Sequence, residues 1–114
     1  MTDVKTLYNE SEELKDAGKL EEAIEKLQAA LAMDENHVLS HLALAVLYGR
    51  VNQHDKACMH GEKACELEPN EAFNFTAMSV TYQRAWQGTQ RQDFITKAED
   101  AMGRAQMLQG NPGH

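Results

Sequence analysis

Apolar residues recur at three- and four-residue spacing along most of the chain, and short polar or glycine-containing segments interrupt them. Residues three and four apart share one face of a helix, so this pattern predicts amphipathic α-helices. Six helices are expected, with approximate bounds 4–17, 19–33, 38–50, 54–67, 71–85 and 93–109. The helix over 38–50 is apolar nearly all round, which is typical of a helix covered by neighbours on more than one side.

Turn signals separate these helices. Gly18 and Asn52 follow the first and third helices, and Pro69 follows the fourth. After Ala85 the regular pattern breaks, so residues 86–92 are expected to form a longer loop or to extend one of the flanking helices. Residues 110–114 are expected to form a flexible tail.

A stretch of 23 residues is echoed within the chain. The segment 14–36 returns 34 positions later as the segment 48–70, with alanine at the same places. Self-similarity at this period is the sequence signature of a solenoid built from helix–turn–helix units. The repeated alanines, Ala23 and Ala30 with Ala57 and Ala64, are expected where paired helices approach closely.

Small and bulky residues alternate in an order that three segments of the chain share. They are Leu14, Gly18, Ala23, Leu27 and Ala30, then Tyr48, Ala57, Gly61, Ala64 and Pro69, then Phe75, Tyr82, Ala98, Met102 and Ala105. With this motif the chain resembles a tetratricopeptide repeat (TPR) protein with repeats 4–37, 38–71 and 72–108, the third interrupted by the insertion 86–92. The resemblance implies an all-α fold, a right-handed α-solenoid of three antiparallel helix pairs forming a single domain over 1–109.

The resemblance also implies where a partner would bind. In the family, the first helix of each repeat lines a concave groove. The corresponding residues here are Tyr8, Asn9 and Glu12, then Leu39, Leu42, Val46 and Arg50, then Phe73, Thr76, Val80 and Arg84. The expected function is that of a non-catalytic protein–protein interaction module, which binds a partner peptide or helix in a partly apolar groove.

Other functions known in the family remain to be weighed. The carboxylate clamp for chaperone C-termini needs Lys, Asn and Arg, but its places hold Tyr8, Glu12, Ala43, Phe73 and Ala77, so that role is not expected. One alternative is a structural unit that forms weak homo-oligomers through an uncapped C-terminal helix. Another is a small TPR-type chaperone. Trp86 is either a secondary partner contact or a plug beside the insertion.

The net charge is −7, and the acidity is concentrated in residues 1–36, which carry ten acidic and four basic residues. An acidic chain argues against nucleic acid and anionic membranes as partners. The N-terminus shows no signal-peptide pattern, and no apolar run approaches a membrane span. Cys58 and Cys65 are seven residues apart, too far for a disulfide within one helix. Together these features predict a cytoplasmic protein.

His54, Cys58 and Cys65 fall on one face of the helix over 54–67, and such side chains can bind zinc. The first repeat, however, has Leu20, Ile24 and Leu31 at the same places, so the three are expected to be core residues. No motif for a nucleophile, a phosphate or a catalytic metal occurs. We therefore expect no cofactor, no metal and no enzyme activity.

Overall fold

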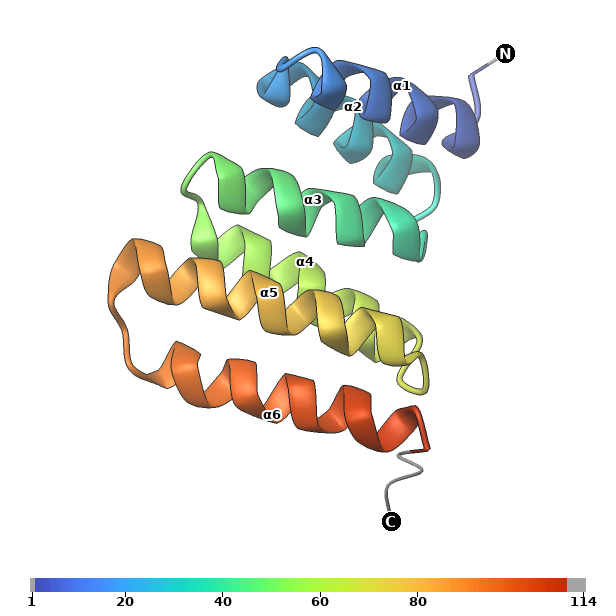
Figure 1. The fold of residues 1–114 in the computed structure, drawn as a ribbon. Coiled ribbons are helices and arrows are strands. Elements are labelled where there is room, and N and C mark those ends of the chain that lie inside the picture. The colour runs from blue at the N-terminus through green and yellow to red at the C-terminus, as the bar shows by residue number, and fades with distance from the viewer. Residues whose placement is uncertain (1, 111–114) are drawn as a thin grey trace.

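The computed structural model describes residues 2–110, which form six α-helices and no strand (Figure 1). The bounds are α1 Val4–Asp16, α2 Leu20–Met33, α3 Val38–Arg50, α4 His54–Leu67, α5 Ala72–Thr89 and α6 Asp93–Leu108. The predicted bounds agree to within one residue, except at the end of α5. Of the predicted tail, 110–114, only Gly110 belongs to the described residues.

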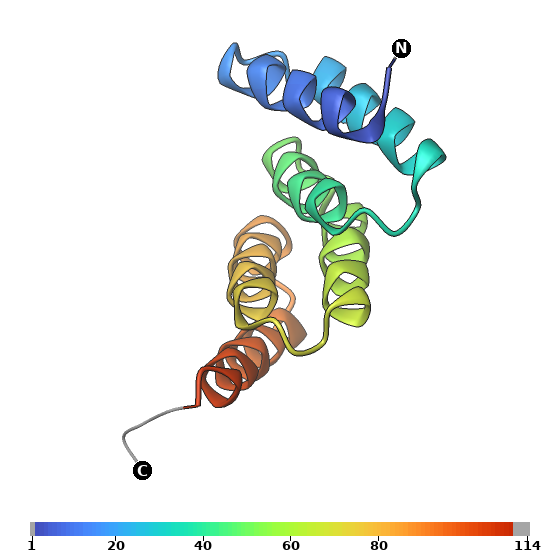
Figure 2. The same cartoon turned by 90° about the vertical axis from the view of Figure 1, so that its right-hand side faces the viewer.

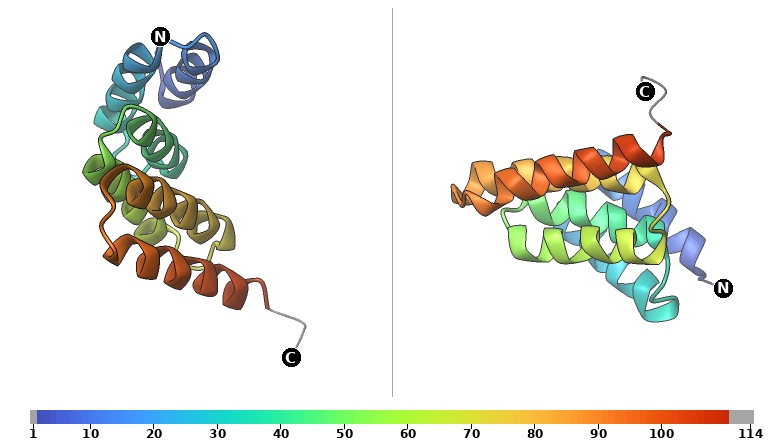
Figure 3. Two further views of the ribbon diagram at one scale, coloured as in Figure 1. Left: turned by 60° about the vertical axis from the view of Figure 1, so that its left-hand side comes forward. Right: turned by 90° about the horizontal axis from the view of Figure 1, so that it is seen from below.

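The helices stack as three antiparallel pairs, with α1 and α6 at opposite ends of the stack (Figure 1). Each helix packs against the next along the chain, and α5 also packs against α3. Successive pairs are rotated relative to each other, so the stack curves (Figures 2 and 3). The described part is elongated, with extents of 50 × 30 × 21 Å. These features define an all-α solenoid.

Two turns within helix pairs are built in the same way. Gly18 has φ +79° and Asn52 has φ +64°, the left-handed conformation that ends many helices. In each turn the N–H of the next residue donates a hydrogen bond to a carbonyl in the last turn of the preceding helix. Lys19 donates to Leu14 at 2.9 Å, and Gln53 donates to Tyr48 at 2.8 Å. The repeat seen in the sequence is therefore a repeat of backbone geometry.

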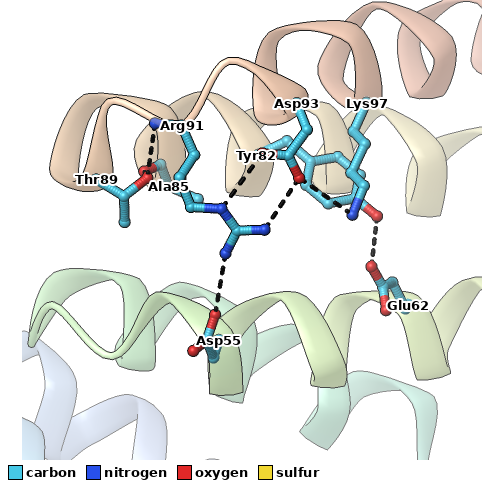
Figure 4. A network of polar contacts seen from close by, with 8 residues as sticks. All are labelled: Asp55, Glu62, Tyr82, Ala85, Thr89, Arg91, Asp93 and Lys97. Atoms are coloured by element: carbon cyan, nitrogen blue, oxygen red, sulfur yellow. Dashed lines mark hydrogen bonds and ion pairs between the residues drawn. The ribbon is translucent and has the colours of Figure 1, made fainter.

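The third turn differs because α5 is longer than expected. The residues from Trp86 to Thr89 continue the helix, so the predicted loop over 86–92 is wrong for these four residues, and the alternative of a helix extension is correct. Gln90 then takes the left-handed conformation at φ +61°, and its N–H donates to the Trp86 carbonyl at 2.7 Å. The hydroxyl of Thr89 donates to the Ala85 carbonyl and accepts from the Arg91 N–H (Figure 4).

A polar network at this turn reaches the second repeat. The guanidinium of Arg91 lies 3.0 Å from a carboxylate oxygen of Asp93 and 3.8 Å from one of Asp55 on α4 (Figure 4). One turn away, Gly88 lies directly against the ring of His54, where a Cβ atom would overlap that ring. The absence of a side chain at Gly88 is thus what lets the extension of α5 lie on α4.

Two apolar clusters form the core. The first joins the first two repeats around Leu27, Leu44 and Leu47, and the second joins the last two around Met78, Tyr82 and Phe94. Small side chains stand where helices meet: Ala23, Ala30, Ala57 and Ala64 are all essentially inaccessible to solvent. The small residues of the repeat motif are therefore packing contacts, because side chains of this size allow two helix axes to come within 8–10 Å.

Replacing Ala23, Ala30, Ala57 or Ala64 with leucine should overpack the contact between helices. Each change should lower the free energy of unfolding by about 1–3 kcal/mol. Urea denaturation of the four single variants measures this. Ala29→Leu, on the exposed face of α2, serves as the control and should leave stability nearly unchanged. Wild-type stability in all four core variants would contradict the packing described here.

A pair of histidines joins the two helices of the second repeat, with His41 on α3 and His60 on α4. The Nδ1 atoms of His41 and His60 are 3.0 Å apart, and His41 Nε2 lies 2.8 Å from the Glu35 carbonyl oxygen. A carbonyl only accepts, so His41 donates from Nε2 and accepts at Nδ1 from the Nδ1–H of His60. The His60 ring also stacks on Tyr48, with ring centroids 5.6 Å apart.

The packing of His60 lowers its pKa to about 4, chiefly through burial and then through the nearby His41 and Lys56. The unfolded chain takes up this proton near the ordinary pKa of about 6.5, whereas the folded protein takes it up only near 4. The unfolded state therefore binds more protons in this window, and stability falls as the pH falls from about 6.5 to 4.

We predict that His60→Gln will flatten this dependence. Because the ring is half-buried and partly screened, wild type should lose about 1–2 kcal/mol more than the variant between pH 7 and pH 4. Urea denaturation of both proteins at several pH values measures the difference. Since each protein is compared with itself at pH 7, a constant loss of stability in the variant does not affect the result. Parallel curves would contradict the assignment.

Candidate partner-binding surface

The first helices of the repeats lie together on one side of the solenoid. The view along α3 and α5 shows these two helices on one side and α4 on the other (Figure 2). Four large apolar side chains on α3 and α5 are exposed: Leu39 (51%), Val46 (39%), Phe73 (63%) and Val80 (43%). In each helix the two residues are seven positions apart and so share one face. With the half-buried Leu42 they form what we call the apolar strip.

One end of the apolar strip is hollowed. Leu39, Leu42 and Phe73 line a cavity of about 380 Å³, whose wall includes Glu68 and Glu71 at the turn between α4 and α5. The structure therefore brings together apolar residues from two repeats, as the sequence predicted from their places in the motif. It also adds two carboxylates that the sequence analysis did not include, because they lie outside the first helices.

The opposite end of the apolar strip carries positive charge. Arg50 ends α3 and Arg84 lies near the end of α5, and both are exposed. The aliphatic part of Arg84 lies close to Gly49, within ordinary contact distance of a Cβ built there. The hydroxyl of Thr76 donates to the Ala72 carbonyl at 3.3 Å. Because α3 and α5 run in parallel (Figure 1), the strip has an acidic and a basic end.

The three predicted residues of α1 differ from the strip in character. Tyr8 is half-buried, and its ring meets the ring of His37 edge-on at 5.9 Å. Burial, followed by the charge of Glu12, raises the pKa of the Tyr8 hydroxyl. Glu12 is paired with Lys15 at 3.2 Å, and Asn9 is exposed. None of the three lines the cavity at Leu39 and Phe73.

Trp86 lies elsewhere. Its half-buried ring lines a hollow of about 450 Å³ between α5 and α6, together with Ile95, Ala98 and Met102. Within residues 2–110 its indole N–H has no hydrogen-bond partner. This hollow is on the last helix pair, where no further pair follows among the described residues, so Trp86 is not part of the apolar strip.

The side chains considered for metal binding are core residues. His54 and Cys58 are buried in the second repeat, and Cys65 is half-buried with its thiol 3.6 Å from the Asn74 carbonyl oxygen. Burial raises the pKa of both thiols to about 11. Between residues 2 and 110 no three His, Cys, Asp or Glu side chains come close enough to hold a metal ion. None of the described helices combines the length and apolar character needed to cross a bilayer.

One cavity was not anticipated from the sequence. It lies between α4, α5 and α6 and has a volume of about 470 Å³, with Phe75, Met78, Tyr82 and Ala101 among its walls. The repeat pattern contained a signal for it, since Ala101 stands where the second repeat has His60.

Comparisons with known proteins identify the class. Residues 12–52 match the family model described as TPR repeat. No curated protein sequence matches the chain. Among solved structures, the chain resembles MamA (TM-score 0.81, 18% identity, 98% of this chain and 61% of MamA). It also resembles the second TPR of Spaghetti (RPAP3), bound to the HSP90 peptide SRMEEVD. The TM-score is 0.77 and the identity 18%, over 94% of this chain and 93% of the other. A third similar structure is that of the Yersinia enterocolitica type III secretion translocator chaperone SycD. Its TM-score is 0.79 and its identity 20%, over 96% of this chain and 77% of SycD.

Residues 12–52 therefore carry a TPR repeat, and the described chain has the all-α solenoid fold of solved TPR structures. The solved structures are 16–20% identical to it, so they establish the fold. The chain spans 61% of the length of MamA and 55% of that of YrrB, another TPR protein with the same fold.

Proposed function

We propose that this chain is a non-catalytic interaction module that binds a partner peptide or helix on the apolar strip. The observation that carries the proposal is the exposure of Leu39, Val46, Phe73 and Val80 on two helices that pack against each other. Contiguous apolar surface of this kind marks a contact site, because leaving it in water is costly. An amphipathic helix or an extended peptide with spaced apolar residues could cover it.

The charges at the two ends of the apolar strip suggest how a partner would be oriented. Glu68 and Glu71 favour a basic segment near Phe73, and Arg50 and Arg84 favour an acidic segment near Val80. Complementary charges of this kind fix orientation and speed association more than they add affinity. The preferred partner is therefore an apolar segment with opposite charges at its two ends.

The carboxylate-clamp role is not part of this proposal. The HSP90 peptide bound by the second TPR of Spaghetti is acidic, and the clamp places in this chain include Glu12, Ala43 and Ala77. A carboxylate at one of these places repels an acidic C-terminus, and alanine offers it no donor.

A Val46→Glu, Phe73→Glu double variant should lose partner capture while it keeps its helical fold, because both side chains are exposed. Placing two carboxylates in an apolar contact desolvates charges without a partner, which should weaken binding by at least tenfold. Affinity capture from an extract of the source cells measures binding, and circular dichroism checks the fold.

The matched control for this experiment is Met59→Glu, Met107→Glu. It introduces the same charges at two exposed apolar residues outside the apolar strip. Capture should survive in the control. If the Val46→Glu, Phe73→Glu variant retains capture, or if both double variants lose it equally, the apolar strip is not the binding site.

The second candidate function is self-assembly through the hollow at Trp86, Ile95 and Met102, which is apolar and lies at the end of the solenoid. A small chaperone, the third candidate, would use the apolar strip itself. Light scattering over a range of concentrations separates them: assembly predicts a mass that rises with concentration, whereas an interaction module or chaperone on its own predicts a constant mass.

A further inference from the structure

The second and third repeats place different side chains at equivalent positions of their interfaces. Within the second repeat, the His60 ring of α4 stacks on Tyr48 of α3 at 5.6 Å with the ring planes 13° apart. The same ring contacts His41. In the third repeat Tyr82 corresponds to Tyr48, but Phe75 replaces His41 and Ala101 replaces His60. The tyrosine is kept and stacks on Phe94 with the ring centroids 6.1 Å apart, but no ring stands at the place of His60.

At the equivalent place of the second repeat, a cavity of about 480 Å³ is lined by His41 and His60, and Tyr48 is not among its walls. With Ala101 in place of His60, the cavity between α4, α5 and α6 reaches Met78 and Tyr82. Its volume of about 470 Å³ is within the range of small-ligand sites, and its apolar walls include Phe75, Met78, Tyr82 and Ala101. Phe75 and Tyr82 lie on the face of α5 opposite Phe73 and Val80, so the cavity is separate from the apolar strip. An aromatic ring placed over Ala101 would lie between Phe75 and Tyr82, as His60 lies between His41 and Tyr48.

Charged side chains surround the mouth of the cavity. Glu62 of α4 accepts a hydrogen bond of 2.6 Å from the Tyr82 hydroxyl, and Lys97 of α6 lies 5.9 Å from the centre of the Tyr82 ring (Figure 4). The guanidinium of Arg104, also on α6, lies 5.7 Å from the centre of the Phe75 ring. The mouth is thus acidic along α4, where Glu62 and Glu66 lie, and of mixed charge along α6, where Asp100 lies between Lys97 and Arg104. The interior offers the faces of the two aromatic rings.

We propose that this cavity binds the aromatic side chain of a phenylalanine or tyrosine residue of a partner protein. His60, stacked on Tyr48 within the second repeat, shows that a planar ring fits this position. A phenyl ring suits it better than imidazole, because the histidine that bonds to His60 is replaced here by Phe75, which offers no hydrogen bond. The charged mouth favours basic residues of the partner beside Glu62 and acidic residues beside Lys97.

The proposal is independent of binding at the apolar strip and can be tested without a known partner. The probes are the capped amino acids N-acetyl-phenylalanine methylamide and N-acetyl-tyrosine methylamide, with N-acetyl-leucine methylamide as the aliphatic control. Titration into ¹⁵N-labelled protein should shift the amide signals of Phe75, Tyr82 and Ala101 in a saturable way. A single side chain should bind with a dissociation constant of about 1–10 mM. The leucine derivative should bind at least tenfold more weakly.

The variant Ala101→His supplies the ring that the second repeat already has. It should fold, and it should weaken binding of the phenylalanine derivative at least tenfold. The matched control is Gln106→His on the exposed face of α6, which should leave binding unchanged. Phe75→Ala removes a wall without filling the cavity and should also weaken binding, which keeps the test decisive if Ala101→His does not fold.

Three results would overturn the proposal. The first is the absence of saturable shifts with either aromatic derivative. The second is equal binding of the leucine derivative, which would indicate an unselective apolar hollow. The third is binding that persists in Ala101→His and in Phe75→Ala, which would place the probe elsewhere.

Discussion

The close approach of paired helices is the constraint on which the rest of this structure depends. Ala23, Ala30, Ala57 and Ala64 are almost fully excluded from solvent, and each stands where two helices meet. Side chains of this size let the backbones approach, and the larger leucine, tyrosine and methionine residues then fill the space between the helix pairs. A solenoid is a one-dimensional structure in which each unit contacts only its neighbours, so these local contacts fix the shape of the whole stack.

The same constraint divides the residues of each first helix into a covered face and an open face. In α5, Met78 and Tyr82 enter the core, and Phe73 and Val80 remain exposed. Exposure of such residues reduces solubility and adds nothing to the stability of the monomer, because their burial would release free energy only with a partner. Acidic groups lie at one end of the apolar strip and arginines at the other, so the two ends of this surface differ in charge.

Comparison of the repeats within the chain is as informative as comparison with other proteins. The hydroxyl of Tyr48 accepts a hydrogen bond of 2.6 Å from Gln28. The hydroxyl of Tyr82 donates one of the same length to Glu62. His60 covers the first ring, but Ala101 leaves a cavity beside the second. Phe75 and Ala101 replace His41 and His60 there, and the third repeat also differs in its longer α5 and in Phe94, which stacks on Tyr82.

The order of helices, the packing alanines and the helix bounds to within a residue, except the end of α5, followed from the sequence alone. These features depend on local periodicity and on a repeat of 34 positions, and both are visible without knowledge of distant contacts. The exposed residues Leu39, Val46, Phe73 and Val80 could also be named, because their places in the repeat determine the side of the solenoid on which they lie.

Only the tertiary structure decided what happens after Ala85 and around Ala101. The sequence at Trp86–Thr89 is compatible with loop or helix, and the helix forms where Gly88 can lie on His54 of another repeat. The cavity at Ala101 likewise depends on side chains from three helices. The half-buried position of Tyr8 depends on its contact with His37, which directly precedes α3. Sequence patterns report the preferences of each segment, whereas cavities and helix ends depend on which side chains of distant segments occupy the same space.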